Sequence, residues 1–335
     1  MGQVGWSFGN QSRAAVRIGE CPDIPGLVAA AVEAGIDEAI VFGKCQTGFS
    51  FHPTRVGVPH PRLKLDLLGA LSRALAGRGL RVFAYLNFGL DGEAGRRHAD
   101  WLQQPASGEV SVTPDHIAKI CPFTPYVDRL ILPLVREMQA GYPLGGFFFD
   151  TMSAFEVCYC PACRAQYRQD CGGDIPTDPG AAEWAGYGVF QARRAAALIE
   201  RIAADIRSRD PDAVVLFNHI GGLVYPGPVP ESIPRLSADP PAVPPWISMQ
   251  ANFMSSGARP VDIFIERFYR GWGDRSGVSD ATLVQKASAI FAYRCRFFVG
   301  DRLHPEGRLA DGSRHAMRVL GALSRLGFAG VADVR

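Results

Sequence analysis

Apolar residues follow two alternating patterns along most of the chain. Short continuous runs, such as residues 38–42 and 145–150, are typical of strands that are buried on both faces of a parallel sheet. Longer segments between these runs, such as residues 65–76, carry leucines at the spacing of one helical face. Strands that alternate with helices in this way predict βαβ units and a parallel sheet.

The predicted elements follow one another without a long polar linker. Strands are expected at residues 4–7, 38–42, 80–87, 145–150, 213–218, 262–268 and 294–299. Helices are expected at residues 24–34, 65–76, 125–140, 181–209, 282–292 and 315–326. The proline-rich segment 221–247 is expected to hold a strand that is short or irregular, because proline cannot donate ladder hydrogen bonds. Seven or eight such units predict an α/β fold, a (β/α)8 TIM barrel that forms a single domain over residues 1–335.

Composition narrows the class of protein. The chain has 335 residues, of which 47% are hydrophobic, and its formal net charge of +2 comes without a basic stripe. This balance gives no sign of a nucleic-acid partner, and no apolar run reaches the roughly 20 residues of a membrane span. The first residues lack the layout of a secretory signal, so a cytoplasmic location is expected. Neither a dinucleotide-binding glycine motif nor the Gly-x-Ser-x-Gly elbow of serine hydrolases is present.

Four of the eight cysteines form a pattern typical of a metal site. Cys121 precedes Cys158, Cys160 and Cys163, and Cys171 is a reserve ligand. Four thiolates at this spacing suit tetrahedral Zn²⁺, and a closed set of four leaves no open coordination position. The sequence therefore predicts a structural zinc ion as the cofactor, with reduced free thiols or a disulfide pair as the alternatives.

Polar residues that end the apolar runs are the candidates for chemistry. In a parallel barrel the active site forms at the carboxyl ends of the strands, so these side chains are expected to converge. Each of them taken alone is also explained as a capping or solvated loop residue. They are Lys44, Asn87, Asp150, Asn218, Glu266 and Asp301.

Asp150 is the clearest of these candidates, because three phenylalanines precede it in a strand that is predicted to be buried. A carboxylate in the barrel mouth can act as a nucleophile or can stabilise an oxocarbenium ion. Glycoside hydrolysis also needs a second carboxyl group, about 5–5.5 Å away in retaining enzymes and about 6.5–9.5 Å away in inverting ones. Glu231, Glu266 and Asp301 are the possible partners of Asp150.

Four sequence blocks resemble a known family. They are residues 42–57 with the following His60-Pro61, residues 146–150 with the Cys-x-Cys-x-x-Cys motif, residues 231–234, and residues 267–274 with 300–307. Together they resemble the hypothetical glycosyl hydrolase family 6 proteins, relatives of α-L-fucosidases of glycoside hydrolase families 29 and 151. The cysteine arrangement is similar to that of family 42 β-galactosidases, where it holds zinc.

The resemblance implies a retaining glycoside hydrolase with a (β/α)8 barrel and a small carbohydrate or glycoside as its partner. Asp150 matches the nucleophile of the fucosidases, and Glu231 or Glu266 is implied as the general acid/base. Association into a homo-oligomer is left open. A non-catalytic carbohydrate-binding barrel and an enzyme of different chemistry on the same scaffold are the alternatives. The residues expected to contact the sugar are Lys44, Gln46, His60, Asn87, Asn218, Trp272, Asp301 and His304.

Overall fold

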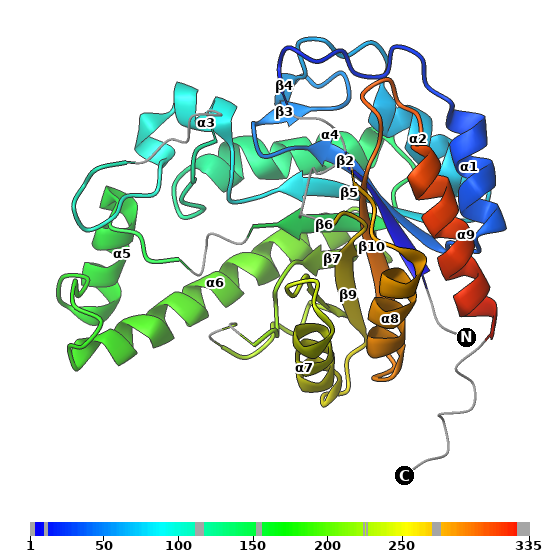
Figure 1. Cartoon of the computed structure of the whole chain (residues 1–335). Helices are drawn as coiled ribbons and strands as arrows, with labels where there is room; N and C mark the ends of the chain where they lie inside the picture. Colours follow the sequence, from blue (N-terminus) through cyan, green and yellow to red (C-terminus); the bar gives the residue numbers. More distant parts are fainter. Residues whose placement is uncertain are drawn as a thin grey trace.

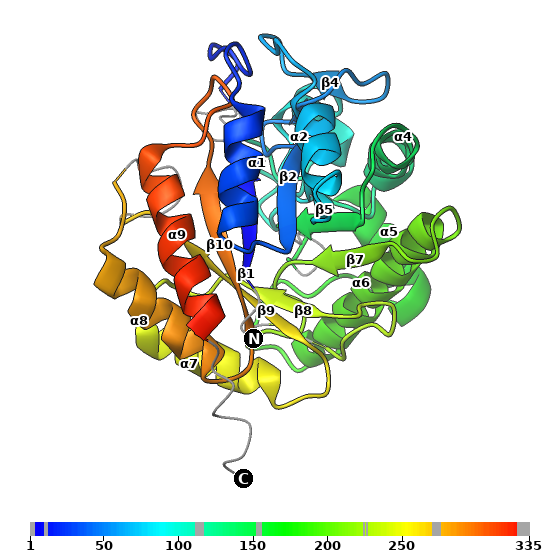
Figure 2. The same ribbon diagram turned by 90° about the vertical axis from the view of Figure 1, so that its right-hand side faces the viewer.

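Strands arranged in a parallel ring form the centre of the molecule, and helices surround them (Figure 1, Figure 2). The computed structural model describes residues 4–9, 13–110, 117–151, 156–223, 225, 227–269 and 276–326. Eight of the strands within these ranges pair in parallel, which confirms the predicted α/β (β/α)8 barrel. They are β1 (Val4–Gly9), β2 (Glu38–Lys44), β5 (Arg81–Asn87), β6 (Gly146–Asp150), β7 (Val214–Phe217), β8 (Leu236–Ala238), β9 (Val261–Glu266) and β10 (Arg296–Arg302).

The ring closes between β7 and β8. Parallel ladders run through the order β7-β6-β5-β2-β1-β10-β9-β8. The two end strands meet through the backbone amide of His219, which donates to the carbonyl of Ser237 at 2.8 Å. The hydroxyl of Ser237 also donates to the carbonyl of Phe217 at 3.3 Å. The proline-rich segment thus contributes a strand of only three residues, β8, as predicted. A strand this short can form few hydrogen bonds with its neighbours.

The helices cover the outside of the ring. In order, they are α1 (Ile24–Glu33), α2 (Leu67–Ala76), α3 (Gly92–Arg97), α4 (Leu132–Gly141), α5 (Pro161–Cys171), α6 (Glu183–Arg207), α7 (Pro244–Ser255), α8 (Asp280–Phe291) and α9 (Asp311–Leu326). A π-helical turn, Val127–Ile131, precedes α4, and two short strands, β3 (Phe49–Ser50) and β4 (Val58–Pro59), follow β2. In Figure 1 the amino-terminal half of α6 extends beyond the barrel beside α5. No helix of the described residues is both long and apolar enough to cross a membrane.

Three helices, α3, α5 and α7, were not predicted, and for α5 and α7 the reason is that their local signals conflict. Helix α7 begins with two prolines, which fit the first turn of a helix where the amide has no partner. Helix α5 also starts at a proline, and it ends at Gly172, whose φ of 78° gives the left-handed cap that glycine favours. In both cases prolines and glycines that read as loop signals mark the ends of helices.

Large side chains fill the barrel interior. Ile40, Phe83, Tyr85, Phe148, Leu216, Phe264 and Phe298 form one buried cluster from six strands. The ring of Phe298 occupies the space next to Gly5 of β1. A Cβ atom at that position would lie 2.2 Å from the ring, so a larger residue would clash with it. Lumen-facing positions alternate with outward-facing ones along each strand, as expected for a small barrel. The interior is therefore a packed core and not a channel.

An ionic layer lies at the amino-terminal end of the strands, below the aromatic cluster. Arg235 contacts Glu38 at 2.7 Å and Asp262 at 2.8 Å, and Arg296 contacts Glu38 at 3.1 Å. Burial raises the pKa of Asp262 to about 7, although both arginines act to lower it. Because all four side chains are largely removed from water, each charge depends on its partners.

Removal of one cation from this layer should destabilise the fold strongly. We expect Arg235→Met to lower the free energy of unfolding by about 3–5 kcal/mol, because it leaves Glu38 and Asp262 buried with one arginine fewer. Arg168→Gln is the matched control, since the ion pair between Arg168 and Asp174 is exposed and should contribute at most about 1 kcal/mol. Urea titrations of both variants measure the difference, and equal losses would contradict the expectation.

Candidate active site

Asp150 lies at the carboxyl-terminal mouth of the barrel and is held by two donors. Its Oδ2 accepts a hydrogen bond from the Tyr85 hydroxyl at 2.7 Å, and its Oδ1 accepts one from the Asn218 side-chain amide at 2.9 Å. Tyr85 belongs to β5, and Asn218 follows β7, so the two strands that flank β6 both hold the carboxylate. Thr151 comes next with a φ of 58°, a left-handed conformation that costs energy for a β-branched residue.

Opposing effects act on the ionisation of Asp150. Burial raises its pKa, and the negative charge of Asp239 raises it further, while the hydrogen bonds from Asn218 and Tyr85 lower it; the net direction is upward. Burial also raises the pKa of Tyr85 well above its usual value, so the phenol stays protonated and can donate. Burial and the nearby Asp239 thus disfavour the ionised form of Asp150, while its two hydrogen-bond donors favour it.

Asp239 is a site residue that the sequence analysis missed. It directly follows β8, and its Oδ1 accepts a second hydrogen bond from the same Asn218 nitrogen, at 3.0 Å. Since this nitrogen bonds both carboxyl groups, the two Oδ1 atoms lie less than about 6 Å apart, an upper limit that includes the spacing of about 5–5.5 Å in retaining glycosidases. The imidazole of His219 lies 2.7 Å from Asp239. A three-residue strand in a proline-rich segment gives no alternation that could have marked Asp239 in the sequence.

Glu266 ends β9, the next strand around the ring, and is half-buried. Burial raises its pKa, Lys286 of α8 lowers it, and Asp239 raises it; the net direction is upward. Asp150, Asp239 and Glu266 therefore lie at the same edge of the barrel, on β6, after β8 and on β9.

Asn87 and Lys44 support this edge from the side of β5 and β2. The Asn87 side-chain amide donates to the Tyr85 hydroxyl at 3.1 Å, and this hydroxyl in turn donates to Asp150. Lys44 is buried, donates to the Asn87 carbonyl at 2.6 Å and forms an ion pair with Asp91 at 2.9 Å. Asn87 is thus brought close to Asp150, whereas Lys44 is buried beneath it and anchors the loop after β5.

Glu231 is not brought together with Asp150. It is exposed in the segment that leads into β8, at the amino-terminal end of the strands. Its neighbours confirm this position: the Pro230 carbonyl accepts from Arg259, just before β9, and the Ser232 carbonyl accepts from Arg207, at the end of α6. The structure therefore separates Glu231 from the mouth by the length of the barrel.

The remaining predicted contacts have partners within the protein. His60 is buried, stacks on Phe51 and bonds the carbonyl of Arg13. Both carboxyl oxygens of Asp301 are engaged, by the Trp6 indole at 3.2 Å and by Arg267 at 3.0 Å. Both side chains are buried, whereas Asp150 is partly exposed, so neither His60 nor Asp301 is presented to a ligand in this arrangement.

Gln46 and His304 lie in loops after β2 and β10. The Gln46 carbonyl accepts from the amide of Gly92, and its side chain is partly exposed. His304 is exposed beside Glu306, at 3.6 Å. Trp272 lies outside the described residues.

The four predicted cysteines come together. Their sulfur atoms all lie within 4.8 Å of one another, and all four side chains are buried. Cys121 comes from the segment between β5 and α4, whereas Cys160 caps α5 and Cys163 lies in its first turn. Four thiols in this arrangement fit a metal ion with tetrahedral coordination. Cys171 is exposed at the far end of α5 and is not part of the group.

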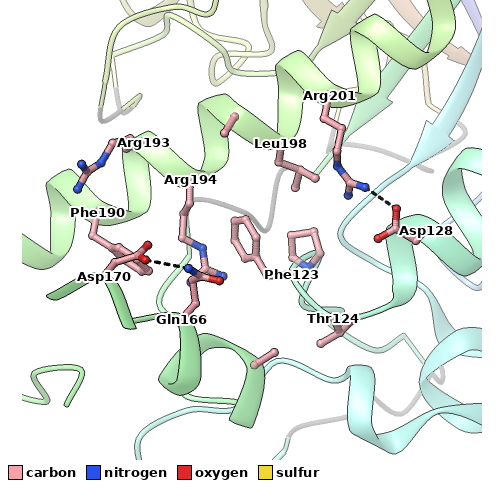
Figure 3. A pocket seen from close by; sticks show the side chains of 13 residues that line it. Phe123, Thr124, Asp128, Gln166, Asp170, Phe190, Arg193, Arg194, Leu198 and Arg201 are labelled. Carbon is pink, nitrogen blue, oxygen red and sulfur yellow. Dashed lines mark hydrogen bonds and ion pairs between the residues drawn. The ribbon is translucent and has the colours of Figure 1, made fainter. Parts of the chain in front are cut away.

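A groove of about 750 Å³ runs beside the cysteine group, between α5, α6 and the segment after Cys121 (Figure 3). Its walls include Phe123, Gln166, Phe190, Arg194 and Arg201. None of the strand-end acids Asp150, Asp239 and Glu266 lines it. The groove is therefore a feature separate from the barrel mouth.

Fold and site together define a TIM-barrel protein with carboxyl groups gathered at its carboxyl-terminal mouth. Residues 23–151 match the model of the family described as hypothetical glycosyl hydrolase 6, which confirms the predicted resemblance for the first sequence block and for residues 146–150. No curated protein matches the chain.

Solved structures with the same fold include three glycoside hydrolases. The α-L-fucosidase isoenzyme 2 from Paenibacillus thiaminolyticus is 22% identical with a TM-score of 0.85, over 99% of this chain and 51% of that one. An α-L-fucosidase from Vibrio sp. strain EJY3 is 15% identical with a TM-score of 0.59, over 99% and 55%. The glycoside hydrolase domain of PgaB (BpsB) from Bordetella bronchiseptica is 14% identical with a TM-score of 0.69, over 96% and 98%. The chain spans about half the length of the two fucosidases.

Proposed function

We propose that this protein is a retaining glycoside hydrolase that acts on a small glycoside, with Asp150 as its nucleophile. The observation that carries the proposal is the Asp150 carboxyl group at the barrel mouth, held by the Tyr85 hydroxyl and the Asn218 amide. The family match over residues 23–151 supports the reaction class, and the fucosidases among the structural neighbours support a sugar of similar size.

In the proposed reaction Asp150 attacks the anomeric carbon while the glycosidic oxygen leaves. A carboxylate held from both sides loses little freedom on reaching the attack position, because Tyr85 and Asn218 fix the two oxygens. The resulting glycosyl ester on Asp150 is then hydrolysed by water, with retention of configuration.

Two acids are candidates for the general acid/base. Asp239 is favoured by its separation from Asp150, which fits a retaining pair. Glu266 is favoured by its raised pKa, since a general acid must hold its proton until the bond breaks. Glu231 has no part in the proposal, because its segment lies at the other end of the strands.

We also propose that Cys121, Cys158, Cys160 and Cys163 hold a structural Zn²⁺ ion. The support is the set of four buried sulfur atoms within 4.8 Å of one another. Such an ion would fasten the segment after β5 to the segment after β6, and Asp150 ends β6. With four thiolates bound it would supply no chemistry to the reaction.

The nucleophile is tested by Asp150→Asn. We expect turnover of activated aryl glycosides to fall at least about a thousandfold, because the amide cannot form the glycosyl ester. Glu231→Gln is the matched control and should keep the rate of the natural sequence. Initial rates across a panel of nitrophenyl glycosides measure both variants. Full activity in Asp150→Asn would exclude this role, and sugar binding without turnover in the natural sequence would support a non-catalytic barrel.

The general acid/base is identified by comparing Asp239→Asn with Glu266→Gln. The variant that lacks the acid/base should still be glycosylated by a substrate with a good leaving group, and should stall at the ester because no base activates water. Added azide should restore its turnover and give a glycosyl azide of retained configuration, which NMR detects. If azide rescues neither variant, both assignments fail.

The metal site is tested by Cys160→Ser. Elemental analysis should find about one zinc ion per chain in the natural sequence and a large loss of zinc in this variant, because three ligands hold a structural ion poorly. Cys171→Ser removes an exposed cysteine that lies outside the group and should keep its zinc. Equal metal content in all three proteins would argue against the proposed ligands.

A further inference from the structure

Arg194 of α6 reaches the cysteine group and contacts it directly. Its Nη2 donates a hydrogen bond to the sulfur of Cys163 at 3.2 Å. Its guanidinium stacks on the ring of Phe123, 3.3 Å from the centroid, and the ring of Phe190 lies 5.1 Å away. In Figure 3 Arg194 lies beside Phe123, whereas the neighbouring Arg193 points away from that ring. One side chain thus connects α6 with both cysteine-bearing segments.

The charge of Arg194 lacks a carboxylate partner among the described residues. Its Nε and Nη1 atoms are buried and have no hydrogen-bond partner there. The two acids that line the same groove are engaged elsewhere, Asp170 with Gln166 and Asp128 with Arg201. Arg194 is partly buried, and a cation whose buried nitrogen atoms lack partners is costly, so a negative charge close to this guanidinium would stabilise it.

The cysteine group supplies that charge when it holds a metal. Four thiolates around a divalent cation leave two net negative charges, and the sulfur of Cys163 is the atom that Arg194 contacts. Four neutral thiols would leave the guanidinium uncompensated, since a thiol is a weak acceptor. The position of Arg194 therefore fits a thiolate cluster better than a set of free thiols.

We infer that Arg194 is a positioning residue of this metal centre, which offsets part of its negative charge and orients Cys163. Partners of this kind, one bond beyond the ligands, typically change metal affinity by about 10–100-fold. The inference rests on the zinc site proposed above and is independent of glycoside hydrolysis. It adds α6 to the elements that the ion holds together.

The test compares three variants in the full chain. Arg194→Gln removes the charge, Arg194→Lys keeps the charge but loses the planar stacking on Phe123, and Arg193→Gln is the matched control on the same helix. Competition with a chromogenic zinc chelator measures the affinity for Zn²⁺. We expect Arg194→Gln to bind zinc about 10–100-fold more weakly, Arg194→Lys to lose less than about tenfold, and Arg193→Gln to match the natural sequence.

A spectroscopic measurement distinguishes an effect of Arg194 on the thiolate ligands from a general destabilisation of the fold. In the Co²⁺-substituted protein, the sulfur-to-cobalt charge-transfer bands report directly on the thiolates. They should shift in Arg194→Gln and stay unchanged in Arg193→Gln. If Arg194→Gln does not fold, Arg194→Met takes its place, because it also removes the charge while its side chain can still pack on Phe123.

Two outcomes would overturn the inference. The first is an Arg194→Gln protein, or an Arg194→Met protein if only that one folds, whose zinc affinity and cobalt bands equal those of the natural sequence. The second is a natural sequence that binds no zinc, which would remove the centre itself. A failure to hydrolyse any glycoside would leave the zinc results standing, so the two proposals fail separately.

Discussion

One amide nitrogen holds together two carboxyl groups that repel each other. Asn218 bonds Asp150 at 2.9 Å and Asp239 at 3.0 Å, and this bridge joins the ends of β6 and β8 across β7. The same region closes the barrel, through the amide of His219 and the carbonyl of Ser237. The geometry of the mouth therefore depends on a seam where few ladder hydrogen bonds exist, and side chains supply the missing connections.

Charge is distributed unevenly along the barrel axis. At the amino-terminal end two arginines balance Glu38 and Asp262, whereas the mouth gathers Asp150, Asp239 and Glu266. The aromatic cluster separates the two layers and keeps water out of the space between them. Burial and the negative charge of Asp239 raise the pKa of Asp150 and of Glu266.

The sequence was sufficient for the features that depend on local pattern. Continuous apolar runs located the strands, and three phenylalanines before Asp150 marked the residue at the centre of the mouth. Asp239 was missed because a strand of three residues has no periodicity, and Glu231 was misplaced because a motif does not tell which end of a strand its loop occupies. The cysteines were recognisable since metal ligation constrains their spacing, but the contact with Arg194 arises from packing between helices far apart in sequence.

The cysteine group draws its four sulfur atoms from either side of β6. Cys121 follows β5, while Cys160 and Cys163 belong to the start of α5, and all of them are buried once these segments meet. An ion could bind the later three sulfurs as soon as that stretch emerged during synthesis. Because Cys121 is made earlier in the chain, its sulfur is already available at that point, and an ion bound by all four would tie the segments on either side of β6 to each other before the later strands of the barrel are made.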